Sequence, residues 1–213
     1  MARDSMTRKE QAEQTREQII SAALELFAER GFAATSTRRV AEAAGVSEGL
    51  IFHHFPNKQA LLVAVARSRS TFSREISRLA DQGARLPART CLSMIGTRFV
   101  EMLDVGGADA QMVAMMVGEA QTNPTLHEVF RDVVESASSS LAAYFQARIE
   151  AGELREDLLA QTSATAFIGS LMLFFMTHSH LESDEWSRLA SAHVEASVEL
   201  WLRGALRESQ EEA

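Results

Sequence analysis

The sequence predicts an all-α protein, made of an N-terminal helix-turn-helix domain of three helices and a larger C-terminal helical bundle. Hydrophobic residues make up 46% of the 213 residues and only 3 residues are proline, which is typical of a globular chain and excludes disordered and collagen-like classes. Apolar residues recur at helical spacing along most of the chain. Glycine and proline residues stand between these periodic segments, where they stop helices.

The first helix is predicted over residues 15–30. Thr15 is a fair N-cap and Gly31 stands where a C-terminal glycine belongs. An apolar stripe at i, i+3, i+4 and i+7 makes this helix amphipathic: Ile20, Ala23, Leu24 and Phe27. Residues 1–12, which carry several charges and no apolar core, are predicted to form a flexible arm and not a signal peptide.

Two short helices joined by a glycine come next. The first runs from Thr37 to Ala44, and Gly45 supplies the left-handed conformation that ends it. Ser47 caps the second helix, and Pro56 ends it because proline biases the preceding Phe55 out of helical geometry. Such a pair is either an ordinary αα-corner or a helix-turn-helix, the unit that lays its second helix in the major groove of DNA.

The rest of the chain is predicted to be helical. A helix over residues 57–80 would belong to two hydrophobic cores and act as one rigid rod that transmits motion between them. Further helices are expected over residues 87–103, 108–120, 124–151, 157–177 and 184–207, each bounded by Gly, Pro or capping residues.

The segment AFIGSLMLFFM, within the helix predicted over residues 157–177, is apolar on almost every side. Such a helix has to be covered all round. A membrane span is one interpretation, but the unbroken apolar run is shorter than the ~20 residues that a bilayer demands. We therefore expect no membrane partner, but a homodimer with a four-helix bundle at its interface. The candidate interface residues are Ala166, Gly169, Ser170, Leu173, Val194, Val198 and Trp201.

Charge is divided unevenly along the chain. Residues 1–80 hold 12 Lys and Arg against 9 Asp and Glu, whereas residues 81–213 hold 9 against 20, which gives net charges of +3 and −11. Positive charge is needed only where a phosphate backbone lies, so this division is compatible with DNA binding but does not demand it. One cysteine, Cys91, excludes an internal disulfide and fits a reducing cytoplasm, where a nucleoid-associated protein would reside.

Three sequence blocks resemble the N-terminal domain of the tetracycline-repressor (TetR) family of transcriptional regulators. They read TREQIIxAAxELFAERGF from Thr15, TSTRRVAEAAGVS from Thr35 and LIFHHFPNKxALL from Leu50. The resemblance implies a DNA-binding domain over residues 13–73, with the motif at about 36–55, and an effector-binding and dimerisation domain over residues 74–213. It also implies a repressor that a small, largely apolar effector releases from a palindromic DNA operator.

The resemblance places the DNA contacts on the two motif helices and just after them. Phosphate contacts would come from Ser36, Lys58 and the arginines, and base contacts from the segment that starts at Ser47. The candidates are Ser36, Arg38, Arg39, Ser47, Glu48, Gly49, Leu50, Phe52, His53 and Lys58. The family commonly has lysine, threonine and tyrosine where this chain has Glu48, Leu50 and Phe52. A helical sensing or interaction protein with weakened DNA binding is therefore the alternative.

Methionine-rich helices of the second domain are candidates for an effector site, because methionine adapts to varied apolar ligands and also fills plain cores. The candidates are Phe99, Met102, Met112, Met115, Met116 and Phe167. We expect no enzyme, because no nucleophile with a base, phosphate loop or metal set is present. No cofactor or metal is expected either, since His178 and His180 lie two apart and point away from each other on a helix.

Overall fold

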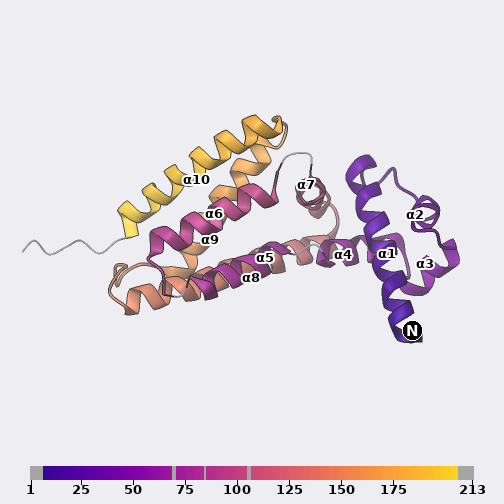
Figure 1. Ribbon diagram of the computed structural model, residues 1–213, viewed down its shortest axis with the longest axis horizontal. Helices are drawn as coiled ribbons and strands as arrows, with labels where there is room; N and C mark the ends of the chain where they lie inside the picture. Colours follow the sequence, from indigo (N-terminus) through magenta and orange to yellow (C-terminus); the bar gives the residue numbers. More distant parts are fainter. Residues whose placement is uncertain (1–6, 69–70, 84, 105–106, 206–213) are drawn as a thin grey trace, which may run out of the picture. The chain divides into compact units, whose positions relative to one another are not determined.

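The computed structural model describes residues 7–68, 71–83, 85–104 and 107–205, and this part of the chain contains ten α-helices and no strand (Figure 1). The predicted all-α class is confirmed. The helices are α1 (Arg8–Arg30), α2 (Thr37–Ala44), α3 (Glu48–His54), α4 (Lys58–Ser68), α5 (Thr71–Gln82), α6 (Ala88–Met102), α7 (Ala108–Ala120), α8 (Pro124–Glu150), α9 (Ala160–His178) and α10 (Ser183–Ala205).

The chain divides into two compact units. The first unit comprises Met1–Arg69 and Gln111–Val129, and the second comprises Ser70–Ala110 and Phe130–Ala213. The first unit thus holds α1 to α4 and most of α7, whereas the second holds α5, α6, α9, α10 and most of α8.

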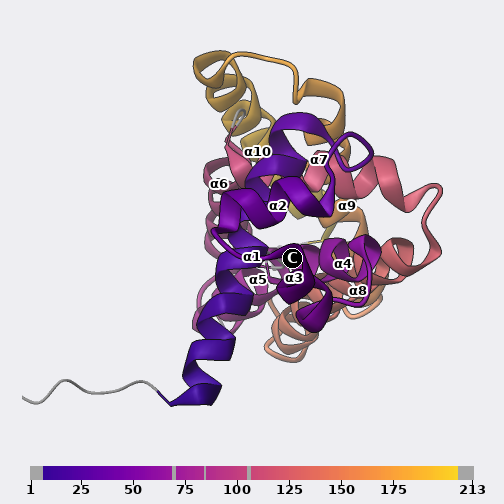
Figure 2. The same ribbon diagram turned by 90° about the vertical axis from the view of Figure 1, so that its right-hand side faces the viewer.

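The core of the first unit forms where α1 packs against α2 and α4, and α2 packs against α3 (Figures 1 and 2). The predicted apolar stripe of α1 is buried there, and Ile51 and Phe55 point inward from the second motif helix with exposures of 1% and 3%. The same core contains Val40, Leu61, Leu62 and Val65, which α2 and α4 contribute. Burial of these large side chains stabilises α2, α3 and α4, which are too short to be stable alone.

The first helix begins earlier than the sequence predicted. It starts at Arg8, because Thr7 and Glu10 form a reciprocal capping box in which the Thr7 hydroxyl accepts from the Glu10 amide and the Glu10 carboxylate accepts from the Thr7 amide. The prediction of a flexible arm over residues 1–12 is therefore wrong from Arg8 onward. Residues 1–6 lie outside the described residues.

The helix predicted over residues 57–80 is described as two helices, α4 and α5. Asn57 caps α4, since its side-chain oxygen accepts from the Ala60 amide at 2.8 Å, and α5 ends before Gly83. Residues 69 and 70, between Ser68 and Thr71, lie outside the described residues. A continuous rod across this junction therefore stays a prediction.

In the second unit, α6 lies against α5 and α10, and α10 also packs against α9. Trp186 of α10 is fully buried and contacts the rings of Phe174 and Phe175 of α9. Gly96 lets α6 approach α10 closely, because a Cβ atom there would lie 2.3 Å from Cγ1 of Val194. The backbone approach at Gly96 therefore sets how α6 and α10 pack.

Cys91 of α6 is buried beside Tyr144 of α8, whose hydroxyl donates to the Leu86 carbonyl at 2.8 Å. Burial raises the pKa of the Cys91 thiol to about 11. A raised folded-state pKa contributes stability below the unfolded pKa of about 8.5, and this stability is lost as pH rises towards 11.

We therefore expect the free energy of unfolding to fall more steeply between pH 8.5 and 10.5 in the wild type than in the variant Cys91→Ala. At about 1.4 kcal/mol for each pKa unit, the difference is on the order of 2 kcal/mol at pH 10.5. Urea unfolding of both proteins across this pH range measures the difference. An equal pH dependence of the two free energies would show that folding does not raise the pKa of the Cys91 thiol.

Candidate nucleic-acid interface

Local capping signals build the helix-turn-helix. The Ser36 hydroxyl accepts from the Arg39 amide at 3.3 Å and caps α2. Gly45 then adopts φ 67° and ψ 29°, the left-handed conformation that the sequence predicts, and Ser47 caps α3 by accepting from the Leu50 amide at 3.2 Å. Phe55, with φ −136°, ends α3 just before Pro56.

The burial of Ile51 and Phe55 fixes which side of α3 faces outward. Gly49 and His53 are exposed, Leu50 is half-buried, and 47% of the large apolar side chain of Phe52 is exposed. This outer surface of α3 combines an uncovered aromatic ring, an imidazole and bare backbone, which are groups that contact base edges and methyl groups in a major groove.

Two threonines that the sequence analysis did not single out hold the motif together. Thr37 donates from its hydroxyl to the Glu48 carboxylate at 2.6 Å, which ties the start of α2 to the start of α3. Thr35 is buried, and its hydroxyl lies 3.1 Å from the Leu26 carbonyl oxygen and 2.9 Å from that of Gly31. The carboxylate of Glu48 is thus engaged within the protein, and its charge still lies on the outer surface.

A shallow hollow of about 410 Å³ lies beside the motif, lined by Ser36, Phe52, Lys58 and the chain from Ala33 to Thr37. The Lys58 ammonium donates to the Ala33 carbonyl oxygen at 3.4 Å and lies 4.2 Å from the centre of the Phe32 ring. Burial lowers the pKa of Lys58, while the charge of Glu119 in the same unit opposes this shift. The hollow therefore presents a hydroxyl and a positioned cation, which together suit a phosphate group.

The two motif arginines are exposed on α2. Arg38 donates from Nε to the Glu42 carboxylate at 3.1 Å, one turn further along the helix. Such an exposed pair is weak, so a DNA phosphate can replace Glu42 as its partner. Arg39 is exposed beside it, which leaves both guanidinium groups available at the start of the motif.

The candidate effector residues are divided between the two units. Phe99, Met102 and Phe167 belong to the second unit, and Met112, Met115 and Met116 belong to the first. Phe99 and Phe167 are buried with exposures of 2% and 3%, and Met112 and Met116 with exposures of 1% and 6%. Phe99 and Met102 border a narrow crevice in the second unit that has no room for a water molecule.

The candidate subunit-interface residues fall into two groups. Ala166, Gly169 and Leu173 are exposed on α9, with Leu173 62% exposed, while Ser170 and Trp201 are half-buried. Val194 and Val198 are only 6% and 2% exposed, and they face the core of their own chain. Their assignment to the interface is therefore corrected: on α10 the exposed apolar side chain is Leu200, which is 76% exposed.

By length and composition alone, α9 is apolar enough to cross a membrane. Its 18-residue window has a mean hydropathy of 1.2, and 28% of that window is buried. The core helix of a soluble protein meets the same criteria. A helix that is apolar and largely uncovered needs a partner surface.

His178 of α9 and His193 of α10 both stack on the ring of Phe174. His178 lies 4.1 Å and His193 4.3 Å from Phe174, measured between ring centres. Burial lowers the pKa of His193. Among the described residues, no group of three or more His, Cys, Asp or Glu side chains is placed to hold a metal ion.

Gly49 offers a direct test of contact between α3 and DNA. A Cβ atom at this position would meet nothing nearer than the Ser47 hydroxyl at 4.0 Å, so the chain itself does not require glycine here. We expect Gly49→Ala to keep or raise the free energy of unfolding, by up to about 1 kcal/mol, because alanine favours helix. The same variant should weaken DNA binding about tenfold by a clash with the groove wall. Fluorescence anisotropy and urea unfolding measure the two effects, and unchanged DNA affinity would contradict close approach at Gly49.

Comparisons with known proteins agree with this geometry. Residues 19–65 match the bacterial regulatory proteins of the tetR family, and residues 90–204 match the AefR-like transcriptional repressor C-terminal domain. The regulator UidR of Escherichia coli is 26% identical over 190 residues, which cover 85% of this chain and 88% of that protein. The probable regulator ArpR of Pseudomonas putida is 38% identical over 84 residues, which cover only 39% of this chain and 40% of that protein.

Solved structures show the same fold. A TetR-family regulator from Mesorhizobium loti superposes with a TM-score of 0.80 at 22% identity, covering 95% of this chain and 100% of that one. FadR of Bacillus subtilis, solved in complex with stearoyl-CoA, superposes with a TM-score of 0.69 at 22% identity, covering 88% and 98%. With a helix-turn-helix at one end and a matching repressor domain over more than half its length, the chain belongs to the TetR family of bacterial transcriptional regulators.

Proposed function

We propose that the protein is a dimeric repressor that binds a palindromic DNA operator and is released from it by a small, largely apolar effector. The DNA-binding domain would comprise residues 13–73 and the effector and dimerisation domain residues 74–213. The observation that carries the proposal is the outer surface of α3, where Gly49, Phe52 and His53 are exposed beside the Lys58 hollow.

Each group has a role that follows from its position. Ser36, Lys58, Arg38 and Arg39 would hold phosphates and fix the register of the protein on the duplex. The segment from Ser47 to His53 would enter the major groove, where His53 hydrogen-bonds base edges and Leu50 and Phe52 contact thymine methyl groups. Glu48 would accept from cytosine N4 or, held by Thr37, only orient α3.

Selection from random-sequence DNA tests the proposed activity. We expect the full-length protein to enrich a palindrome whose half-sites lie about one helical turn or somewhat more apart. Fluorescence anisotropy on the enriched duplex and on a scrambled duplex at the same salt then gives the specificity ratio. If no palindrome is enriched at moderate salt, the protein is not a repressor. The alternative function, a helical sensing or interaction protein with weakened DNA binding, would then hold.

The exposed apolar surface of α9 and α10 supports dimerisation. Leu173 and Leu200 are 62% and 76% exposed, and a Cβ atom at Gly169 would meet nothing within 4 Å in its own chain. Two copies that bury this surface against each other would form the four-helix bundle that the sequence predicts. A two-fold symmetric dimer also matches a palindromic operator.

Replacing Leu173 and Leu200 together by glutamate is expected to raise the dimer dissociation constant at least tenfold, because four carboxylates would enter an apolar interface. Sedimentation velocity over a concentration series measures this, and circular dichroism checks that the helices remain. The matched control is Leu159→Glu, at a residue that is 70% exposed just before α9. A double variant that dimerises as tightly as the wild type would place the interface elsewhere.

An effector needs only a modest preference for one state. To weaken operator binding a hundredfold it must favour the non-binding state by about 2.7 kcal/mol. The stearoyl-CoA bound by FadR has a long apolar chain, and the methionine and phenylalanine side chains of this protein would suit an effector with an apolar part.

A further inference from the structure

An open groove of about 720 Å³ lies between α5 and α6 in the second unit. Its charged lining residues are three arginines and two glutamates: Arg78, Arg89, Arg98, Glu75 and Glu101. Hydroxyl side chains from one face of α6 add further hydrogen-bonding groups, and Leu79 and Met94 give it an apolar floor. This volume is within the usual range for small-molecule sites, about 300–1,000 Å³.

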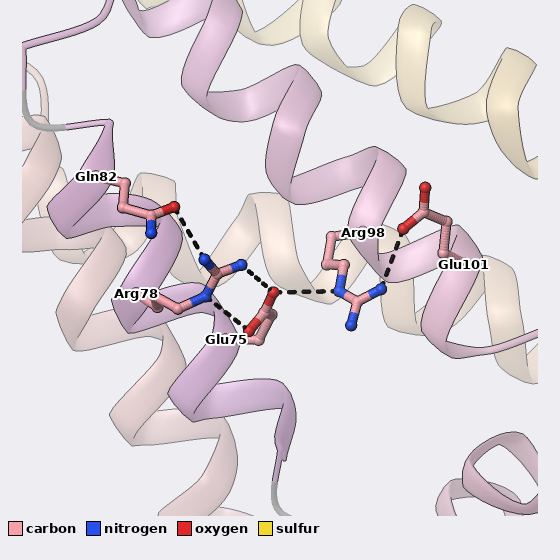
Figure 3. A network of polar contacts seen from close by, with 5 residues as sticks. All are labelled: Glu75, Arg78, Gln82, Arg98 and Glu101. Carbon is pink, nitrogen blue, oxygen red and sulfur yellow. Dashed lines mark hydrogen bonds and ion pairs between the residues drawn. The ribbon is translucent and has the colours of Figure 1, made fainter.

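One carboxylate holds two of these guanidinium groups (Figure 3). Glu75 accepts from Nε of Arg78 at 3.0 Å and from Nε of Arg98 at 3.2 Å. Arg98 also donates from Nη1 to Glu101 at 3.1 Å, while its Nη2 donates no hydrogen bond to any described residue. Its side chain is 48% exposed, so donor capacity remains open to the groove.

The charges in and beside the groove balance. Arg89 forms an ion pair with Glu199 of α10, so the three guanidinium groups face three carboxylates: Glu75, Glu101 and Glu199. The Arg78 guanidinium holds the pKa of Glu75 below its usual range. An anionic group can add to this network at Arg98, where Nη2 is left over, or by displacing a carboxylate.

The same ion pair borders an apolar space on the inner side of the two helices. Glu75, Leu79 and Arg98 line both the groove and a narrow crevice that has no room for a water molecule. The other residues that line this crevice are apolar: Ile76, Ile95, Phe99 and Met102. Met102 is flexible by nature and can move to admit an apolar group. The Glu75–Arg98 pair thus separates the charged groove from an apolar interior.

We propose that this groove is the entrance of the effector site and that the effector is an amphipathic monocarboxylate, with its carboxylate on Arg98 and Arg78 and its apolar chain past Leu79 towards Phe99 and Met102. The inference rests on the proposed function, since it names the effector class of that regulator. A carboxylate matches the planar fork of a guanidinium and makes the stronger, charge-assisted hydrogen bonds. Glu75 competes with the ligand for the same two arginines.

This competition makes the effects of two variants opposite in sign. Arg98→Gln removes the fork and should weaken binding of the carboxylate at least tenfold. Glu75→Gln removes the competing charge and should strengthen binding several-fold. A purely structural role for the ion pair would make both variants weaken binding, so the two signs together identify a ligand site.

The test is isothermal titration of the full-length protein with three probes that share one chain: decanoate, decan-1-ol and decylamine. Arg188→Gln, an exposed arginine on α10 outside the groove, is the control for charge. We expect decanoate to bind and decan-1-ol and decylamine to bind at least tenfold more weakly. We also expect Arg188→Gln to bind decanoate as the wild type does.

Three results would overturn the proposal: no binding of decanoate, equal binding of decan-1-ol or decylamine, or the same decanoate affinity in Arg98→Gln and Arg188→Gln. Operator binding by the ligand-free wild type is measured separately. If the wild type binds no operator, the proposed repressor function fails, and the titrations still decide whether the groove takes a carboxylate.

Discussion

Replacing Gly96 by alanine is expected to destabilise the protein by about 3 kcal/mol, at the upper end of what overpacking of a core produces. The new methyl carbon would lie 2.3 Å from Cγ1 and 3.1 Å from Cγ2 of Val194, which is buried on α10. Neither helix can move away without opening the packing around the fully buried Trp186. Urea unfolding followed by circular dichroism measures the loss.

A second substitution isolates the cause. Val194→Ala removes both methyl groups and leaves only the Cβ atom, 3.2 Å from the added carbon, so the double variant should recover most of the stability. Gly118→Ala in α7 is the matched control, because a Cβ atom there meets nothing within 4 Å. It should be neutral or stabilising by up to about 1 kcal/mol. If the double variant is no more stable than Gly96→Ala, the contact with Val194 is not the source.

Replacing Lys58 and Arg38 together by alanine is expected to weaken operator binding about a hundredfold at moderate salt. The slope of log K against log salt is negative, and each phosphate contact adds about 0.9 to its magnitude. The double variant, which removes two such contacts, should therefore have a slope that is about 1.8 less steep. Lys58 is already positioned by the Ala33 carbonyl and the Phe32 ring, and Arg38 is exposed at the start of the motif. Anisotropy titrations between 50 and 200 mM salt measure both quantities.

The control removes the same charge elsewhere. Arg85 and Arg188 are exposed in the second unit, and their replacement by alanine should leave the salt slope unchanged. Specificity should also separate the roles, because loss of a phosphate contact weakens all sequences alike whereas His53→Ala should relax the choice of base. A slope unchanged in the Lys58 and Arg38 variant would show that neither residue contacts phosphate.

The sequence alone determined the local structure of the motif. Gly45, Ser47 and Pro56 act on the backbone within one helical turn, so their chemistry fixes where α2 ends and where α3 begins and ends. The inward positions of Ile51 and Phe55 follow from helical spacing for the same reason. The start of α1 is also determined locally, by the Thr7 and Glu10 capping box, which lies one to two turns before the predicted cap at Thr15.

Only the tertiary structure decided which neighbour each surface meets. Helical spacing places Val194 and Val198 on one apolar face of α10. In the structure, α6 of the same chain covers Val194, so this face does not meet a second subunit there. The close approach at Gly96 and the ion pair between Glu75 and Arg98 join residues on different helices. The periodicity of apolar residues identifies the buried face of a helix, because this face is set by the sequence of that helix alone. Which helix covers the face depends on how the helices pack, and no single stretch of sequence specifies this packing.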